Sequence, residues 1–478
     1  MNVTHSNPHT TINCQNDDAF LIRLLKFVLK KLKIRELFER YIQDPRVRVD
    51  HYGLTFLLMH ALLTHIFRSP SKNKFHQQTL RPQASAAVAK FIDLAGYIDH
   101  CPCPRTIDNV LTHLNPDDFK SILPEIFRSL CRRKVFQLHP ELIPQNQYAI
   151  AIDAHVTHVY HDDSQHPCQT CPYCLKRTRG NSIWYLHTDL VAAFVAPNGL
   201  KIPILFHRIK ARPGWEQLPE QRWKQECERT AFPGLLRELR NQFPRLHFCI
   251  HLDALYATDQ IFTLLEELNM NYSIVKKAKV LKTVGEDCTG LRLFNTPLKR
   301  DFEKGRFKIS QTIHFFNDVA YRAHRLSIIQ LDENAEKKIS KRFAKVTSKK
   351  THWEWIIGER LSHANFRKIA SQSRLRWKEE DMFNDLQHRG FAICHDFNRA
   401  PAAQLVRTYL ILIAYAICEI LTYTRQGQTI LSKGMTIWFM MEQMLTDLIY
   451  VPETLLFPAR AYGQMRFCRD PPPPPAHR

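Results

Sequence analysis

The segment Tyr148-Ala149-Ile150-Ala151-Ile152-Asp153 is apolar up to its final aspartate, a pattern that predicts a buried strand with a carboxylate at its end. A second segment, His247-Phe248-Cys249-Ile250-His251-Leu252-Asp253, repeats the pattern and continues into Ala254-Leu255-Tyr256. Ligands of α/β sheets gather along the edge formed by the carboxyl ends of the strands. We therefore expect Asp153 and Asp253 to face one site. Taken alone, each aspartate could instead be a turn or helix-cap residue.

The sequence around these two strands predicts an alternation of strands and helices. A segment rich in histidine and cysteine follows Asp153, and we interpret it as a loop. Further strands are expected at Ile183–His187, Leu190–Val195, Ile202–Ile209 and Tyr272–Val275, and helices at Gln225–Arg240 and Asp259–Leu268. Asn198-Gly199 predicts a hairpin turn, and Pro233-Gly234 is expected to interrupt its helix. This order is typical of a mixed α/β sheet of the ribonuclease-H-like kind.

The rest of the chain divides into regions of different character. Residues 1–140 read as helical, residues 141–285 hold the first part of the sheet domain, and residues 286–360 predict a β-rich insertion. Strands of the insertion are expected at Leu291–Phe294, Arg306–Phe316, Ala323–Leu331 and Thr351–Ile357. Residues 361–450 should complete the domain with helices, and residues 451–478, which include Pro471–Pro475, predict a disordered tail.

Charge and composition point to a nucleic-acid partner. The chain has 478 residues, with 67 Lys and Arg against 46 Asp and Glu, a formal net charge of +21. Such a surplus attracts polyanions, nucleic acid first, and the basic helices of residues 1–140 could bind DNA or simply present a solvated face. The sequence contains neither a Gly-rich phosphate loop nor a serine nucleophile elbow, so ATP use and acyl transfer have no support.

Cysteine usage and hydropathy predict a cytoplasmic protein outside the membrane. The 13 cysteines are scattered along the chain, which favours reduced thiols over a secreted disulfide framework. Residues Met1–Cys14 lack the apolar core of a signal peptide. The apolar segment Tyr409–Cys418 is too short to span a bilayer and predicts a buried helix.

A third acidic segment, Arg374-Leu375-Arg376-Trp377-Lys378-Glu379-Glu380-Asp381-Met382-Phe383, predicts a helix. Arg376 and Glu380 are four residues apart, so they share one helix face. A glutamate there could bind a metal ion while Arg376 contacts phosphate, or the two could form a surface ion pair. Magnesium needs only a few carboxylates, because water and substrate phosphate supply its other ligands. Glu379 is the alternative to Glu380 as the third carboxylate.

Two further clusters carry binding chemistry. Cys168, Cys171 and Cys174 with His166 have the spacing of a zinc site, although free thiols in a loop are the alternative. Tryptophans Trp353, Trp355 and Trp377 could stack nucleic-acid bases or belong to the core, as we prefer for Trp355. The basic residues beside them are Lys349, Lys350, Arg374 and Arg376.

Together these motifs resemble the DDE transposases of bacterial insertion sequences, in the group with a Tyr/Arg/Glu/Lys signature. Asp253-Ala254-Leu255-Tyr256 is similar to the group's second motif, Asp-x-Leu-Tyr. The group's third motif resembles Arg-Trp-x-x-Glu-x-x-Phe-Asn-x-Leu-Lys, followed by Arg-Gly-Tyr/Phe and a later His. The residues of this chain that match it are Arg376, Trp377, Glu380, Phe383, Asn384, Leu386, Arg389, Gly390, Phe391 and His395. Lys224-Gln225-Glu226-Cys227-Glu228 also resembles a Lys-Gln-Asp-Cys-Glu block. The resemblance covers roughly residues 145–425, and more faintly Asp44-Pro45-Arg46.

The resemblance implies a ribonuclease-H-like catalytic domain in which Asp153, Asp253 and Glu380 bind two Mg²⁺ or Mn²⁺ ions. It implies cleavage of DNA at terminal inverted repeats and strand transfer into target DNA. Pairing two DNA ends implies at least a homodimer, associated with the bacterial nucleoid when bound to DNA. Arg376, Arg374, Trp377, Gln387, Lys349 and Lys350 are then the expected DNA contacts.

The chain departs from the group's pattern at two positions. Gln387 stands where the motif has lysine, and Ser373 stands where it has tyrosine. Two other functions therefore stay open: a catalytically inactive, transposase-derived DNA-binding protein, and a metal-dependent nuclease without strand transfer.

Overall fold

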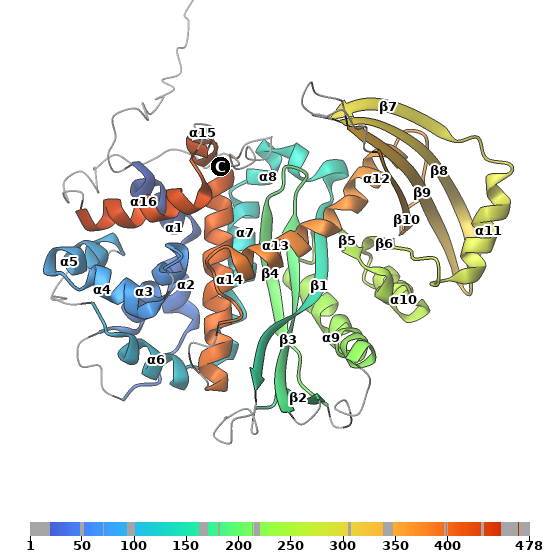
Figure 1. The fold of residues 1–478 in the computed structure, drawn as a ribbon. Coiled ribbons are helices and arrows are strands. Elements are labelled where there is room, and N and C mark those ends of the chain that lie inside the picture. Colours follow the sequence, from blue (N-terminus) through green and yellow to red (C-terminus); the bar gives the residue numbers. More distant parts are fainter. Residues whose placement is uncertain are drawn as a thin grey trace, which may run out of the picture.

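The computed structural model describes most of the chain between residues 20 and 450. The described residues are 20–47, 52–69, 71–92, 101–161, 171–179, 182–212, 214, 220–304, 307–337, 348–395, 398, 400–431, 435–450 and 467. They form a mixed α/β structure around one large sheet (Figure 1).

The centre of the sheet combines antiparallel and parallel strands. Its five central strands are β1 (Tyr148–His161), β3 (Ser182–Val195), β4 (Lys201–Arg208), β5 (Phe248–Leu252) and β6 (Asn271–Val275). Strand β1 pairs antiparallel with β3, and β3 pairs antiparallel with β4. On the other side of β1, strands β5 and β6 continue the sheet in parallel. The spatial order is thus β4-β3-β1-β5-β6, and the short strand β2 (Leu175–Arg179) pairs with the first part of β3 on the same edge as β4.

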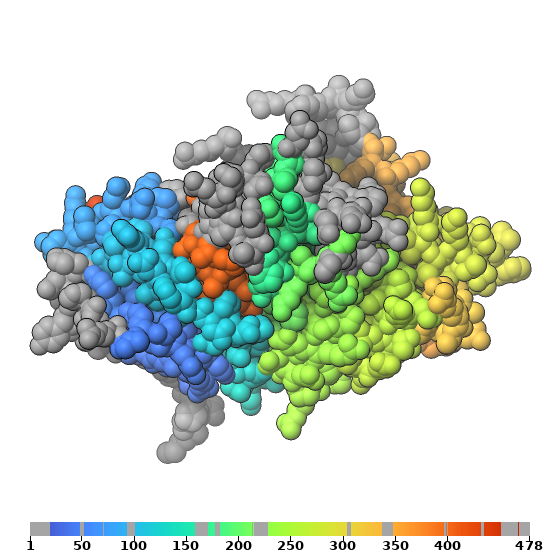
Figure 2. All heavy atoms as spheres, turned by 90° about the horizontal axis from the view of Figure 1, so that it is seen from below, coloured from blue at the N-terminus to red at the C-terminus, as the bar shows by residue number. Residues whose placement is uncertain are grey.

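The β-rich segment extends this sheet beyond β6. Strand β10 (Ser348–Ile357) pairs antiparallel with β6, and β9 (His324–Lys337), β8 (Phe307–Tyr321) and β7 (Leu298–Lys304) follow in order. Figure 1 shows these four strands as a curved layer at the end of the molecule opposite the N-terminal helices, and Figure 2 shows the same two ends from below. The strand predicted at Leu291–Phe294 is wrong, because helix α11 (Lys282–Arg292) occupies its first two residues. The local apolar pattern there does not distinguish a helix end from a strand.

Helices precede and follow the sheet, as the sequence predicts. Those before it are α1 (Phe20–Leu32), α2 (Ile34–Tyr41), α3 (Leu54–Ile66), α4 (Lys72–Thr79), α5 (Pro82–Phe91), α6 (Pro104–His113), α7 (Ile122–Arg132) and α8 (Val135–Leu138). Those between the strands are α9 (Glu220–Gln242) and α10 (Asp259–Glu267). Those after the last strand are α12 (Phe366–Ser373), α13 (Trp377–His388), α14 (Pro401–Tyr423), α15 (Arg425–Leu431) and α16 (Ile437–Tyr450).

Helix α14 joins the N-terminal helices to the sheet. It packs against α1, α3 and α6 on one side and against β4 on another (Figure 1). The helix is 23 residues long, so the sequence underestimates its length. It is long and apolar enough to cross a membrane, but 94% of its most apolar window is buried inside the protein. We therefore read it as the core helix predicted from Tyr409–Cys418.

Three local expectations differ from the structure. Residues 154–161, the first part of the predicted loop, are not a loop, because β1 runs on to His161 as the partner of β3. The two strands predicted at Ile183–His187 and Leu190–Val195 form one continuous strand. Helix α9 passes through Pro233 without ending. The turn at Asn198-Gly199 is confirmed: Gly199 has φ +98°, a conformation that glycine adopts without strain.

Within the predicted tail, residues 451–478, the structure describes Phe467. It is buried, bridges Thr424, and its backbone N–H donates to Nε2 of His139 at 3.1 Å. The other residues of 451–478 lie outside the described part of the chain.

A buried ion pair fixes the register of the antiparallel strands. Arg208 on β4 donates to both oxygens of Asp189 on β3, at 2.8 and 3.0 Å, and each side chain is 1% exposed. Thr157 of β1 donates to Asp189 at 2.6 Å, and Arg208 also donates to Thr408 of α14 at 2.9 Å. One network therefore ties three strands to the core helix.

Replacing Asp189 by asparagine should destabilise the fold strongly, because the buried charge of Arg208 would lose its carboxylate. We expect Asp189→Asn to lower the free energy of unfolding by about 3–5 kcal/mol, measured by denaturant titration. The matched control is Asp381→Asn, whose partner Lys378 is solvent-exposed. That exposed pair should contribute less than about 1 kcal/mol. Equal losses in the two variants would contradict a structural role for the buried pair.

Candidate active site

Asp153 and Asp253 lie at the carboxyl ends of the parallel pairing between β1 and β5. The pairing of the two strands covers Tyr148 to Ala151 on β1, and Asp153 follows two residues later. Asp253 follows the last residue of β5 and caps a short 3₁₀ turn, where its side chain accepts the Leu255 N–H at 2.7 Å. The predicted position at this sheet edge is therefore confirmed for both, although β1 itself continues past Asp153.

The third acidic segment crosses the same edge. The 3₁₀ turn Arg374–Arg376 packs against β1 and β5, and helix α13 that follows packs against β1, β3 and β4. Glu379 and Glu380 occupy the first turn of α13. Long-range packing thus brings together acidic residues from three distant segments.

Arg376 connects these acidic groups. Its side chain is buried, and its guanidinium lies 2.6 Å from Oε1 of Glu380 and 3.7 Å from Oδ2 of Asp153. The predicted i, i+4 pair of Arg376 and Glu380 is present, and it reaches a third group, Asp153. Arg376 therefore neutralises carboxylates in this structure, a position from which it could also contact a phosphate group.

The carboxylates of the site interact electrostatically. Burial first, and then the charge of Asp253, raise the pKa of Asp153 to about 6. Arg376 opposes this shift, and the charge of Glu380 adds to it. A carboxylate whose pKa is raised by burial and by neighbouring acids gains from a nearby cation. The charges of Asp253 and Glu380 therefore both act on the carboxylate of Asp153.

Glu379 is the acidic group that the sequence ranks second, and its environment is unusual. It is fully buried, and within the described part of the chain neither carboxylate oxygen has a hydrogen-bond partner. Burial first and then the charge of Asp153 raise its pKa well above the ordinary value. Burial therefore disfavours the charged form of Glu379, whereas the side chain of Glu380 is 40% exposed.

The donor set fits a divalent cation that prefers oxygen ligands. Hard cations such as Mg²⁺ bind carboxylates together with water and substrate phosphate. Asp153, Asp253 and Glu380 could supply these carboxylates, and the buried, unbonded oxygens of Glu379 could supply another. Among the described residues, the group whose potential metal-ligand atoms all lie within 4.8 Å of one another is a different cluster, described below. The acidic trio is more widely spaced than that, so one ion could not touch all three in this arrangement.

The face of α13 that contains Glu380 continues along β1. Phe383 stacks on the ring of His155, with centroids 4.7 Å apart. Gln387 contacts Nε2 of His155 and donates to the sulfur of Cys394 at 3.4 Å. Gln387, predicted as a DNA contact, therefore also packs within the protein beside β1. Ser373, the other departure from the motif, is buried and accepts a hydrogen bond from Ser273 at 2.7 Å.

Aromatic and basic side chains lie next to the acidic site. Trp377 is 43% exposed and meets Trp353 edge to face, with ring centroids 5.7 Å apart. Arg374 pairs with Glu333 at 2.8 Å and lies over the ring of Trp353. Lys349 and Lys350 are exposed on β10. Trp355 is buried in the core, as its position in a predicted strand favours.

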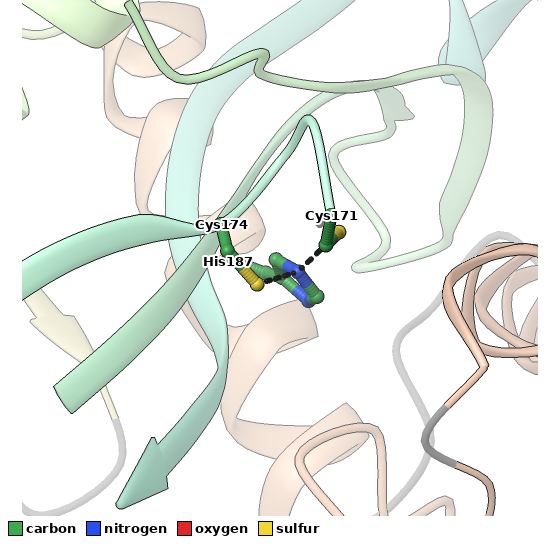
Figure 3. A group of neighbouring side chains, drawn as sticks. All are labelled: Cys171, Cys174 and His187. Carbon is green, nitrogen blue, oxygen red and sulfur yellow. Dashed lines mark hydrogen bonds between the residues drawn. The ribbon is translucent and has the colours of Figure 1, made fainter. Parts of the chain in front are cut away.

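The predicted zinc ligands are only partly described. Cys171 and Cys174 lie together, whereas His166 and Cys168 lie outside the described residues. The histidine that joins the two cysteines is His187 of β3, which the sequence reasoning missed (Figure 3). The missing signal was strand register: Leu175 pairs with Leu186, so Cys174 and His187 are opposite each other. That register depends on a β2–β3 pairing that local patterns do not reveal.

Comparison with known proteins does not identify a family for this chain. No protein-family model matches it, and no curated protein matches it significantly. The functional interpretation therefore rests on the residues and on their arrangement in the fold.

The raised pKa of Asp153 predicts a variant that is more stable than the natural protein. Because the pKa is higher in the folded state than its ordinary value near 4, ionisation of Asp153 destabilises the fold as pH rises from about 4 to about 6, and the loss is complete above that. Asp153→Asn should therefore raise the free energy of unfolding by about 1–3 kcal/mol at pH 7.5 in metal-free buffer, and not at pH 4.

Denaturant titrations at the two pH values, in the presence of a chelator, would measure this difference. The control Asp381→Asn, on the exposed face of α13, should change stability by less than about 0.5 kcal/mol at both pH values. A destabilised Asp153→Asn protein at pH 7.5 would contradict the crowded-carboxylate description.

Proposed function

We propose that this protein is a DNA transposase that uses Asp153, Asp253 and Glu380 for metal-dependent phosphoryl transfer. The observation that carries the proposal is the meeting of three acidic segments, far apart in the chain, at one edge of the parallel strands. Asp153 lies in electrostatic contact with both other carboxylates.

The topology of the sheet supports the ribonuclease-H-like part of this proposal. Three antiparallel strands, a helix, a parallel strand, a helix and another parallel strand follow one another in β1, β3, β4, α9, β5, α10 and β6. This alternation of strands and helices is the one expected for that fold. The strands β7 to β10 then stand as an insertion between the second and third acidic segments.

In the proposed reaction, a water molecule hydrolyses the phosphodiester bond at the end of the element and releases a 3′-hydroxyl. That hydroxyl then attacks a phosphodiester of target DNA, which joins the strands and expels a new 3′-hydroxyl. Bound divalent ions supply activation of the nucleophile and stabilise the attacking and leaving oxygens. Asp153 must be ionised to bind a cation, so the raised pKa makes binding pH-dependent near pH 6. Arg376 could leave one of its two carboxylate partners and bind a phosphate oxygen instead.

The charge distribution supports DNA as the partner. The net charge of +21 favours attraction to the phosphate backbone. Trp377 and Arg374 are partly exposed beside the acidic site, and Lys349 and Lys350 are exposed on β10. Binding of paired terminal repeats implies a homodimer on DNA, in the cytoplasm of a bacterium.

A second candidate function is that of a catalytically silent DNA-binding protein derived from a transposase. It is favoured by Gln387, which lacks the lysine charge of the motif and is engaged with His155. The silent protein and the transposase differ in one measurable property, Mg²⁺-dependent nicking of DNA ends. A nuclease without strand transfer would nick ends and fail to join them to target DNA.

The transposase proposal predicts that single carboxylate substitutions abolish cleavage and preserve DNA binding. Asp153→Asn or Asp253→Asn should lower Mg²⁺-dependent nicking of labelled terminal-repeat DNA by more than about 100-fold. Loss of a residue that only supports a metal ligand can already cost up to about 100-fold, and loss of a ligand itself should cost more. Binding of the same DNA in Ca²⁺ or chelator should stay within about threefold, because each variant removes one negative charge and no basic contact.

The control is Asp381→Asn, which makes the same chemical change on the exposed face of α13 and should keep wild-type cleavage. Wild-type cleavage rates in Asp153→Asn or Asp253→Asn would refute the assignment. Normal end binding with no nicking by the natural protein would favour the silent protein instead.

A further inference from the structure

The cluster of Cys171, Cys174 and His187 is separate from the acidic site. Cys171 and Cys174 flank the turn that leads into β2, and His187 lies on β3 (Figure 3). The sulfur of Cys174 lies 2.9 Å from Nε2 of His187, and the sulfur of Cys171 lies 3.4 Å from the same atom. The ligand atoms of all three residues fall within 4.8 Å of one another.

The geometry around Nε2 of His187 suits a cation better than a hydrogen bond. Two sulfur atoms approach one ring nitrogen, but that nitrogen has either one N–H or one lone pair and can serve one partner well. An ion between the three atoms would use all of them. With Zn–S bonds of about 2.3 Å and a Zn–N bond of about 2.0 Å, tetrahedral ligands stand roughly 3.5 Å apart. The Cys171 sulfur, 3.4 Å from Nε2, is already near this separation, and the Cys174 sulfur, 2.9 Å away, would move outward by roughly half an ångström.

The turn also prepares the sulfur atoms for metal binding. The backbone N–H of Cys174 donates to the carbonyl of Cys171 at 3.2 Å and closes the Cys-Pro-Tyr-Cys turn. The closed turn keeps both sulfur atoms within 4.8 Å of the ring nitrogen of His187.

We propose that Cys171, Cys174 and His187 bind a zinc ion with a structural role. Soft thiolate ligands with one imidazole select zinc and discriminate against Mg²⁺, which prefers oxygen. Both Cys171 and His187 are buried, whereas a catalytic zinc needs an open position for water or substrate. The described residues supply three ligands, and a tetrahedral ion takes a fourth.

The position of the cluster explains what the ion would stabilise. Next to Cys171, the carbonyl of Pro172 accepts a hydrogen bond at 3.2 Å from the N–H of Ala211, which lies just after β4. His187 is two residues before Asp189, the centre of the buried network on β3. The ion would therefore tie the turn before β2 to β3, the strand that pairs with β1 beyond Asp153. Loss of the ion should loosen the β2–β3 hairpin.

Metal analysis of the full-length protein tests the proposal. The protein is produced in medium supplemented with zinc, purified without chelators, and its metal content is measured by inductively coupled plasma mass spectrometry. We expect about one zinc per chain in the natural protein and loss of most of it in Cys171→Ser, Cys174→Ser and His187→Ala. The control Cys103→Ser replaces an exposed cysteine at the start of α6 and should keep its zinc.

A second measurement avoids the risk that a variant fails to fold. The natural protein, loaded with Co²⁺ in place of zinc, should show the intense visible bands and the thiolate charge-transfer band of a tetrahedral sulfur site. The proposal is overturned by a natural protein that holds neither metal, with free thiols or a Cys171–Cys174 disulfide, or by zinc that persists in all three variants. These results are independent of Mg²⁺-dependent cleavage, so the zinc site and the transposase proposal can fail separately.

Discussion

Repulsion between crowded carboxylates is the constraint on which the candidate site depends. Asp153, Asp253, Glu379 and Glu380 gather where β1 and β5 cease to pair, and the charges of neighbouring acids, together with burial, make Asp153 and Glu379 harder to ionise. The buried guanidinium of Arg376 offsets this repulsion by contacting two of the acids, one on the sheet and one on α13. A fold that keeps such a cluster gives up stability, and functional sites are where proteins do so.

Helix α13 carries two of these acids, so its position on the sheet decides the geometry of the site. Asp385 of α13 accepts hydrogen bonds from the ammonium of Lys201 on β4 at 2.7 Å and from the hydroxyl of Tyr415 on α14 at 3.2 Å. Burial raises the pKa of nearby Glu419 to about 7, while Lys201 opposes the shift. The core helix, the antiparallel strands and the acid-bearing helix thus share one buried polar network. The residues of this network all lie outside strands β7 to β10.

The sequence predicts the parts of the structure that depend on local pattern. The apolar strands that precede Asp153 and Asp253, the Asn198-Gly199 turn and the amphipathic helices all follow from short-range periodicity. The continuation of β1 past Asp153 and the approach of His187 to the cysteines depend on pairing between distant strands, which a single sequence does not encode locally. Glu379 illustrates the same limit, because its burial against Asp153 comes from the docking of α13 and not from its own neighbours.

Anomalous diffraction from crystals soaked in Mn²⁺ tests the central claim most directly, because it locates the ion relative to each carboxylate. The account predicts manganese in contact with Asp153 and Asp253, with Glu380 as the third carboxylate after Arg376 moves away. A peak coordinated by Glu379 in place of Glu380 would contradict the assignment of the third ligand. Manganese bound elsewhere, with Asp153 and Asp253 touching no ion, would contradict the account as a whole.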